Sequence, residues 1–217
     1  MDRSRRAAGI GAVLQGLFFL IVLVLIFAVL PGFGLRGPGD FTDPAKLLPF
    51  AATQPLVAFW LLPGDILFSV FLVVAVVGLH EQLSAKSPSL MRLASAAGLV
   101  ATALILANGT IGASIMQLAQ GYPQNRPAAD TAYLTLSLVS SNGVGLVSGG
   151  IFAYGWWAAL VSWVALRARV FPSALNYLGL LFGLAGIAAI LIPPLGLLGP
   201  ILGIVWCLWL GLALLRA

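Results

Sequence analysis

Long apolar runs separated by short polar or Gly- and Pro-rich segments dominate the pattern of this sequence. A helix needs about 20 mostly apolar residues to cross roughly 30 Å of hydrocarbon, because every backbone N–H and C=O must be bonded within the segment. The runs that meet this condition lie at about 9–30, 56–79, 93–118, 145–166, 174–192 and 195–215. The pattern therefore predicts an all-α fold, a single domain (1–217) that forms an integral membrane bundle of six transmembrane helices.

The fourth of these spans is the hardest to place. The region from Asp130 to Leu166 has no charge inside it and would be about 55 Å long as one helix. This length exceeds one membrane crossing and is too short for two crossings with a turn. We expect a break in the Gly- and Ser-rich stretch 140–143, so that 131–144 is a lead-in and 145–166 is the span. A continuous, tilted helix that projects from the membrane is the alternative.

Composition supports a membrane protein. Hydrophobic residues make up 61% of the chain and charged residues 8%, with a mean hydropathy of +1.08. A water-soluble domain carries about a quarter of its residues as charged side chains. The composition therefore excludes secreted disulfide scaffolds, disordered regulators and typical nucleic-acid-binding proteins, and the single cysteine, Cys207, forms no disulfide within the chain. We expect no nucleic acid among the partners.

Basic residues predict the orientation of the bundle. With six spans, the two termini and the links at 80–92 and 167–173 lie on one side of the membrane. That side carries Arg3, Arg5, Arg6, Lys86, Arg92, Arg167, Arg169 and Arg216. The opposite side, which includes an extracytoplasmic loop at 31–55, carries Arg36, Lys46 and Arg126. By the positive-inside rule, both termini are cytoplasmic and the location is the cell (inner or plasma) membrane.

Asp65 is the one acidic residue inside a predicted span. Inserting a charged side chain at the membrane centre costs about 3 kcal/mol of free energy on insertion scales, so an aspartate inside a span indicates a structural or functional role. One interpretation is a protonatable or ligand-binding carboxylate, with Asn108 and Asn142 as polar partners in a candidate intramembrane site. The other is a helix cap, because Asp65 follows Pro63-Gly64 and a helix that restarts there would begin at the aspartate. The residues leave both interpretations open.

Small residues four apart recur in the last three spans. Such spacing lets two helix backbones approach closely. The pairs are Gly145 and Gly149, Gly179 and Gly183, and Gly199 and Gly203. They predict close helix packing within a C-terminal bundle, or a seam with another membrane protein or a second copy of the chain. Lipid is the other expected partner.

Catalytic motifs are absent from the sequence. There is no P-loop, dinucleotide fingerprint, nucleophile elbow or HExxH motif, and one histidine with one cysteine cannot form a haem or metal site of the usual composition. We therefore expect no catalytic residues and no cofactor or metal. The leading hypothesis is a non-catalytic membrane protein, such as a structural or accessory subunit of a membrane complex. The alternative is a protein that binds or transports a small solute, a cation or protons through Asp65.

The C-terminal third carries a pattern shared with one family. Its elements are Gly155-Trp156-Trp157, Phe171-Pro172, the stretch 175–179 (LNYLG), and Trp209-Leu210-Gly211 followed by Leu215-Arg216. With Asp65 in the second span, these residues resemble the domain-of-unknown-function 4386 family of bacterial multi-pass membrane proteins. The resemblance implies about six helices in a bacterial inner membrane and implies no activity.

Overall fold

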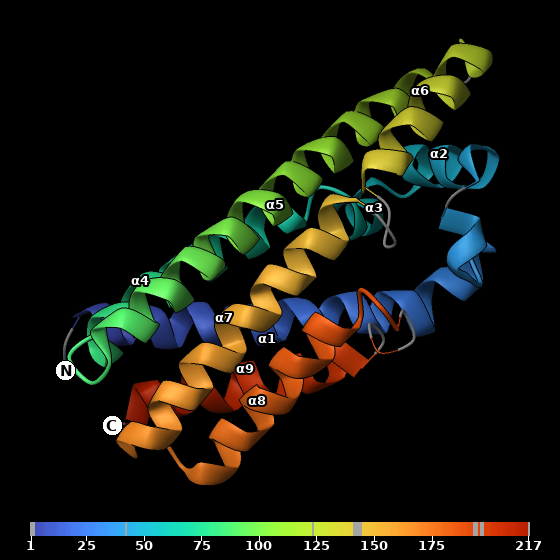
Figure 1. Cartoon of the computed structure of the whole chain (residues 1–217). Helices are drawn as coiled ribbons and strands as arrows, with labels where there is room; N and C mark the ends of the chain where they lie inside the picture. Colours follow the sequence, from blue (N-terminus) through green and yellow to red (C-terminus); the bar gives the residue numbers. More distant parts are fainter. Residues whose placement is uncertain are drawn as a thin grey trace.

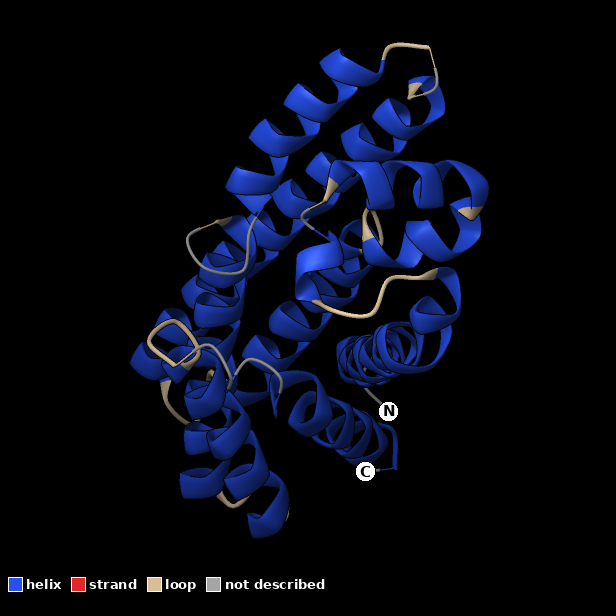
Figure 2. Cartoon of the chain, turned by 90° about the vertical axis from the view of Figure 1, so that its right-hand side faces the viewer, coloured by secondary structure: helices blue, strands red, loops and turns tan. Residues whose placement is uncertain are grey.

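The computed structural model describes residues 3–41, 43–122, 124–140, 145–192, 195 and 198–216. All regular elements in these residues are helical (Figure 2). In chain order they are α1 (Arg3–Val24), η1 (Leu25–Val29), η2 (Leu30–Phe33), η3 (Pro38–Phe41), α2 (Pro44–Thr53), α3 (Pro55–Leu61), α4 (Asp65–Leu83), α5 (Pro88–Gly121), α6 (Arg126–Ser140), α7 (Leu146–Ala168), α8 (Ser173–Ala188) and α9 (Leu198–Arg216).

Five helical segments are long and apolar enough to cross a membrane: Arg3–Phe33, Asp65–Leu83, Pro88–Gly121, Leu146–Ala168 and Leu198–Arg216. The predicted fifth span corresponds to α8, which is apolar but has only 16 residues. At about 1.5 Å per residue its length is about 24 Å, less than the roughly 30 Å of the hydrocarbon core. The prediction of an all-helical fold is confirmed for the described residues, and five of its helices are long and apolar enough to cross a membrane, whereas the count of six crossings depends on α8.

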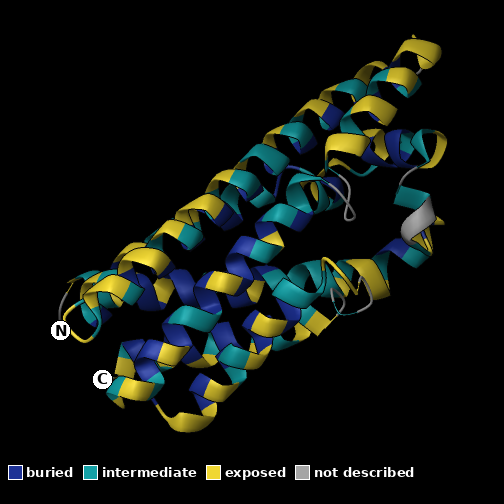
Figure 3. Cartoon of the chain, viewed as in Figure 1, coloured by how far each residue is buried: buried dark blue, intermediate teal, exposed yellow. Residues whose placement is uncertain are grey.

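Six helices form a closed ring in which each one packs against two neighbours, in the order α1, α4, α5, α7, α8, α9 and back to α1 (Figure 1). The interior of the ring contains one large apolar cluster, which includes Leu72, Trp157, Phe182 and Trp206. Large apolar side chains are also exposed, such as those of Val77, Leu99, Leu184 and Leu212. Figure 3 shows exposed positions along the outside of the helices. Helices that are apolar on all faces and unburied suit a lipid environment.

A second apolar cluster lies at one end of the bundle. Here the last turns of α5 extend beyond the ring and pack against α6 and α2 (Figure 1). We call this region the cap: it comprises residues 30–41, α2, the end of α5, and α6. Its buried side chains include Leu30, Leu47, Leu48, Ile115 and Tyr133. Both chain termini lie at the opposite end of the bundle, which we call the termini end (Figure 1).

The cap corrects the expectation of a plain loop at 31–55. This segment contains α2 because Asp43 accepts a 2.9 Å hydrogen bond from the Ala45 N–H and Pro44 occupies the first helical position. Both are standard signals of a helix start. Gly34, at φ +84°, ends η2 in the left-handed region that glycine adopts without strain.

Of the lead-in expected at 131–144, residues 131–140 belong to α6, which runs from Arg126 to Ser140, and 141–144 lie outside the described residues. This helix is distinct from α7, which begins at Leu146. Helix α6 folds back along the end of α5 (Figure 1). The 37-residue region therefore divides near the Gly- and Ser-rich stretch, as one of the two alternatives requires.

Candidate functional site

The second predicted span is interrupted where it meets α5. Helix α3 ends at Leu61, α4 begins at Asp65, and residues 62–64 form a turn between them. Pro63 favours such a break because it has no N–H to donate to the preceding turn. Two glycines of α5 pack against the turn, where a larger residue would not fit. A Cβ on Gly109 would lie 2.7 Å from the Ile66 nitrogen, and one on Gly112 would overlap the Leu62 carbonyl group. The two backbones therefore touch at this break.

Asp65 lies at this break and faces α5. The Asn108 side-chain N–H donates a 2.8 Å hydrogen bond to the Asp65 carboxylate, and the Ser140 hydroxyl donates a 2.7 Å hydrogen bond to the Asn108 side-chain oxygen. The three side chains come from α4, α5 and α6 and are all partly buried. Together they form a hydrogen-bonded relay, the Asp65 relay, that joins the bundle to the cap.

The geometry bears on the two interpretations of Asp65. The helix does restart at this residue, as the cap hypothesis requires, but Gly64 occupies the N-cap position and no side chain caps α4. The carboxylate instead contacts a different helix. The structure thus brings together Asp65 and Asn108, two of the three residues of the predicted intramembrane site.

The third candidate, Asn142, lies outside the described residues. Ser140, two positions earlier, supplies the contact that sequence reasoning did not single out. In the sequence, only the hydroxyl of Ser140 and its position close to Asn142 pointed to this residue. They could not distinguish the members of the polar stretch 140–142, because the contact depends on how α6 folds back against α5.

Charge around the Asp65 relay is unbalanced. Within the described part of the chain, no basic side chain forms an ion pair with Asp65; the ion pair found there joins Lys46 to Asp40 in the cap. The same residues contain no group of three or more His, Cys, Asp or Glu side chains that could hold a metal ion. The relay therefore offers one carboxylate, one amide and one hydroxyl.

A second polar cluster lies deep in the bundle. The Tyr154 hydroxyl donates a 2.7 Å hydrogen bond to the Gln15 side-chain oxygen and lies 3.4 Å from the Cys207 sulfur. The Gln15 amide donates in turn to the carbonyls of Gly11 and Phe71, at 3.3 and 3.4 Å. These contacts join α1, α4, α7 and α9. All three side chains are buried, and the Tyr154 ring contacts Phe68 and Phe182, so the cluster ties these helices together.

The candidate packing glycines have different surroundings. Gly179 and Gly183 face α7, where a Cβ on Gly183 would lie 2.6 Å from the Gly155 carbonyl oxygen, and Gly203 packs against Phe19. Gly149 approaches a Leu104 methyl group, and Gly145 precedes the first turn of α7. Gly199 has no described atom within 4 Å of where a Cβ would be. Most of this small-residue surface is thus used inside the chain.

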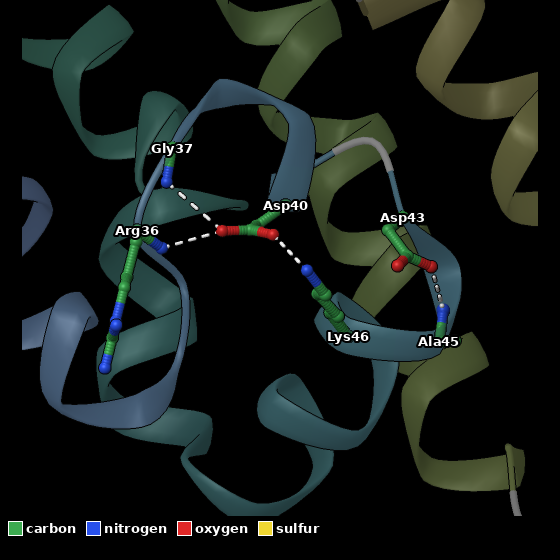
Figure 4. Close-up of polar contacts among 6 residues, drawn as sticks. All are labelled: Arg36, Gly37, Asp40, Asp43, Ala45 and Lys46. Atoms are coloured by element: carbon green, nitrogen blue, oxygen red, sulfur yellow. Dashed lines mark hydrogen bonds and ion pairs between the residues drawn. The ribbon is translucent and has the colours of Figure 1, made fainter.

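Polar contacts also order the loop of the cap. The Asp40 carboxylate accepts hydrogen bonds from the backbone N–H groups of Arg36 and Gly37, at 2.8 and 3.2 Å, and pairs with the Lys46 ammonium group (Figure 4). The contact with Lys46, followed by the one with Arg36, lowers the pKa of Asp40 from 3.8. The loop is therefore arranged around an ionised carboxylate.

Tyr133 makes the stability of the folded protein depend on pH in the alkaline range. Its hydroxyl donates a hydrogen bond to the Phe41 carbonyl, and burial, with a smaller contribution from Asp43, raises the pKa of Tyr133 from 10.0 to about 12. The native state then holds this proton more tightly than the unfolded chain does. The corresponding stability is fully present below pH 10 and is lost as the pH rises to about 12.

We expect Tyr133→Phe to lower the unfolding free energy by about 1 kcal/mol at neutral pH, because one hydrogen bond is lost. It should also weaken the alkaline loss of stability. Thermal unfolding of both proteins in detergent at neutral and alkaline pH measures this. Tyr177→Phe is the control, since Tyr177 is 62% exposed. An alkaline transition unchanged in Tyr133→Phe would contradict the assignment.

The ring of helices, five of which are long and apolar enough to cross a membrane, has the features of a helical, multi-pass membrane protein. Residues 14–217 match the family described as a domain of unknown function (DUF4386), and the chain belongs to that family. This confirms the resemblance found in the sequence. No curated protein and no solved structure has detectable similarity to the chain.

Proposed function

We propose that this chain is a non-catalytic, multi-pass protein of a bacterial cell membrane that binds a small monovalent cation at Asp65, in competition with a proton. The observation that carries the proposal is the Asp65 relay: a partly buried carboxylate held by an amide from another helix and without a basic partner among the described residues. An uncompensated charge in such a place is costly, so carboxylates there are protonated or bind a cation.

The hydrogen bonds of the relay favour the ionised form of Asp65, which is the form that binds a cation. Ser140 donates to Asn108 and Asn108 donates to Asp65, so both hydrogen bonds point toward the carboxylate. Donors oriented in this way stabilise the ionised form and can strengthen one another. A single carboxylate matches the charge of a monovalent ion, whereas Ca²⁺ takes six to eight oxygen ligands.

The helix break supports the same proposal. Non-helical backbone at membrane depth is tolerated where it is buried in protein or lines a cavity. Discontinuous helices also form the ion and substrate sites of many transporters. Here the break at 62–64 is covered by α5, and Asp65 is the first residue after it. An enzymatic role would need a second acid or a nucleophile in contact with the carboxylate, whose described side-chain partner is an amide.

We place both termini in the cytoplasm and count α8 as a sixth crossing. Helix α8 packs between α7 and α9, as a spanning helix at its position in the ring would. Both termini lie at one end of the bundle, as an even number of crossings requires (Figure 1). The links from α4 to α5 and from α7 to α8 supply Lys86, Arg167 and Arg169 to that end, which the positive-inside rule assigns to the cytoplasm.

Thermal unfolding tests the cation site. A ligand that binds only the folded protein stabilises it by RT ln(1 + [L]/Kd), or about 2.7 kcal/mol at a hundred times Kd. For the protein in neutral detergent, we expect NaCl or KCl to raise the melting temperature more than choline chloride of equal ionic strength does. Asp65→Asn should abolish that difference. Asp130→Asn, which removes an acid of the cap instead, should retain it.

Equal effects of sodium, potassium and choline on the wild-type protein would contradict the site. An alkali-cation effect that persists in Asp65→Asn would place the binding elsewhere.

A role as an accessory subunit is the second candidate. An apolar groove of about 370 Å³ runs between α8 and α9, lined by Leu181, Leu184, Ala185, Ala188, Leu195, Leu198, Ile201 and Leu202. The open side of Gly199 lies on the first turn of α9. These features favour contact with another helix. Purification in a mild detergent with mass spectrometry should then recover a stoichiometric partner, whereas a clean monomer would count against this role.

A further inference from the structure

A pocket of about 220 Å³ lies at the termini end of the bundle, opposite the cap (Figure 1). It is formed by the link from α4 to α5 together with the last turns of α7. The lining residues are Lys86, Ser87, Leu90, Val164, Arg167 and Ala168. Two of them are basic and none is acidic, so the pocket has a net positive charge.

The polar side of the pocket is suited to an oxyanion. Lys86 and Arg167 are both exposed and line the pocket from different elements, Lys86 from the link between α4 and α5 and Arg167 from α7. Ser87 stands directly before α5, and its side chain makes no capping hydrogen bond to that helix. The hydroxyl is therefore not committed to the helix start. The first turn of α5 adds the favourable potential of a helix N-terminus.

The other side of the pocket is apolar. Leu90, Val164 and Ala168 belong to α5 and α7, both of which are long and apolar enough to cross a membrane. The Arg167 guanidinium carbon also lies 4.8 Å from the ring centre of Trp163, which is 40% exposed. Tryptophan and arginine in this arrangement are typical of the region where lipid headgroups meet the hydrocarbon.

We propose that this pocket binds the phosphate group of an anionic phospholipid. Lys86 and Arg167 pair with the phosphate oxygens, Ser87 donates a hydrogen bond to it, and the apolar wall contacts the glycerol and the first acyl carbons. The apolar wall favours a lipid over free phosphate, because only the lipid covers that wall. Basic pockets between membrane helices bind anionic headgroups by the same chemistry.

Native mass spectrometry of the full chain in detergent tests the proposal. The probes are phosphatidylglycerol, phosphatidylcholine and inorganic phosphate, added separately and in competition. We expect the chain to retain phosphatidylglycerol in preference to phosphatidylcholine, and an excess of inorganic phosphate not to displace it. The variants Lys86→Gln and Arg167→Gln should each weaken retention about tenfold, the effect of one charge-assisted contact.

Variants of basic residues outside the pocket distinguish binding in the pocket from a general effect of the positive charge of the protein. Arg36→Gln and Arg126→Gln remove basic residues of the cap and should leave retention unchanged, while Lys86→Arg should preserve it. Melting temperatures without added lipid show whether each variant is folded. Equal retention in the wild-type protein and in the folded double variant Lys86→Gln, Arg167→Gln would overturn the proposal. Displacement by inorganic phosphate would overturn the assignment to a lipid.

Discussion

Gly112→Ala is expected to destabilise the protein by about 3 kcal/mol or more, the upper part of the range for overpacking. An added Cβ would overlap the carbonyl group of Leu62, and the next nearest atom is the Pro63 nitrogen at 2.8 Å. These are backbone atoms of the turn between α3 and α4, which cannot rotate away as a side chain can. The break would have to move off α5, and the Asp65 relay with it.

Gly121→Ala is the matched control for this substitution. Gly121 lies in the same helix, and no described atom would come within 4 Å of its Cβ. Alanine at an exposed helical position should be neutral or stabilising by up to about 1 kcal/mol. Thermal unfolding of the two variants in one detergent makes the comparison. Similar melting temperatures for both would show that α5 does not touch the turn.

Tyr154→Ala is expected to cost about 3 to 5 kcal/mol, as for other large aromatic side chains removed from a core. The Tyr154 ring stacks on Trp157 with centroids 5.4 Å apart and meets the edges of Phe68 and Phe182 at 5.8 and 5.4 Å. The substitution would leave a cavity at the centre of the ring of helices. It would also remove the donor to Gln15.

Tyr154→Phe separates these two contributions. It keeps the ring contacts and loses only the hydroxyl, so we expect a cost of about 0.6 to 2 kcal/mol, the range for hydrogen bonds in membrane interiors. Tyr177→Ala serves as the exposed control. Unfolding measured by tryptophan fluorescence reports all three variants, since Trp157 and Trp206 lie in the same cluster. A cost for Tyr154→Phe equal to that for Tyr154→Ala would show that packing is not the main contribution.

The membrane helices could be predicted because the signal is local. A run of apolar residues specifies a span whatever it packs against. The ends were less accurate: α5 extends from Pro88 to Gly121 rather than 93–118, because polar residues continue a helix once it leaves the hydrocarbon. Helix α2 was missed although Asp43 and Pro44 signal its start, since the many Gly and Pro residues of 31–55 favoured a loop.

The candidate site was only partly predictable. Asp65 stands out by its charge and the break by Pro63-Gly64, both of which are visible in the sequence. The contact with Asn108 joins residues 43 positions apart and depends on how far α4 is displaced along α5. That displacement is set by the close approach at Gly109 and Gly112. The contacts among Gln15, Tyr154 and Cys207 involve three separate spans, and no periodicity in the sequence connects them.

If a cation and a proton compete for the Asp65 carboxylate, adding a salt of that cation should release the proton. In weakly buffered detergent solution, titrated through the acidic range, NaCl or KCl should release up to one proton per chain from the wild-type protein and from Asp130→Asn. Choline chloride should release none, and Asp65→Asn should release none with any of these salts. Equal release from the wild-type protein and Asp65→Asn, or no release from either at any pH, would contradict the claim.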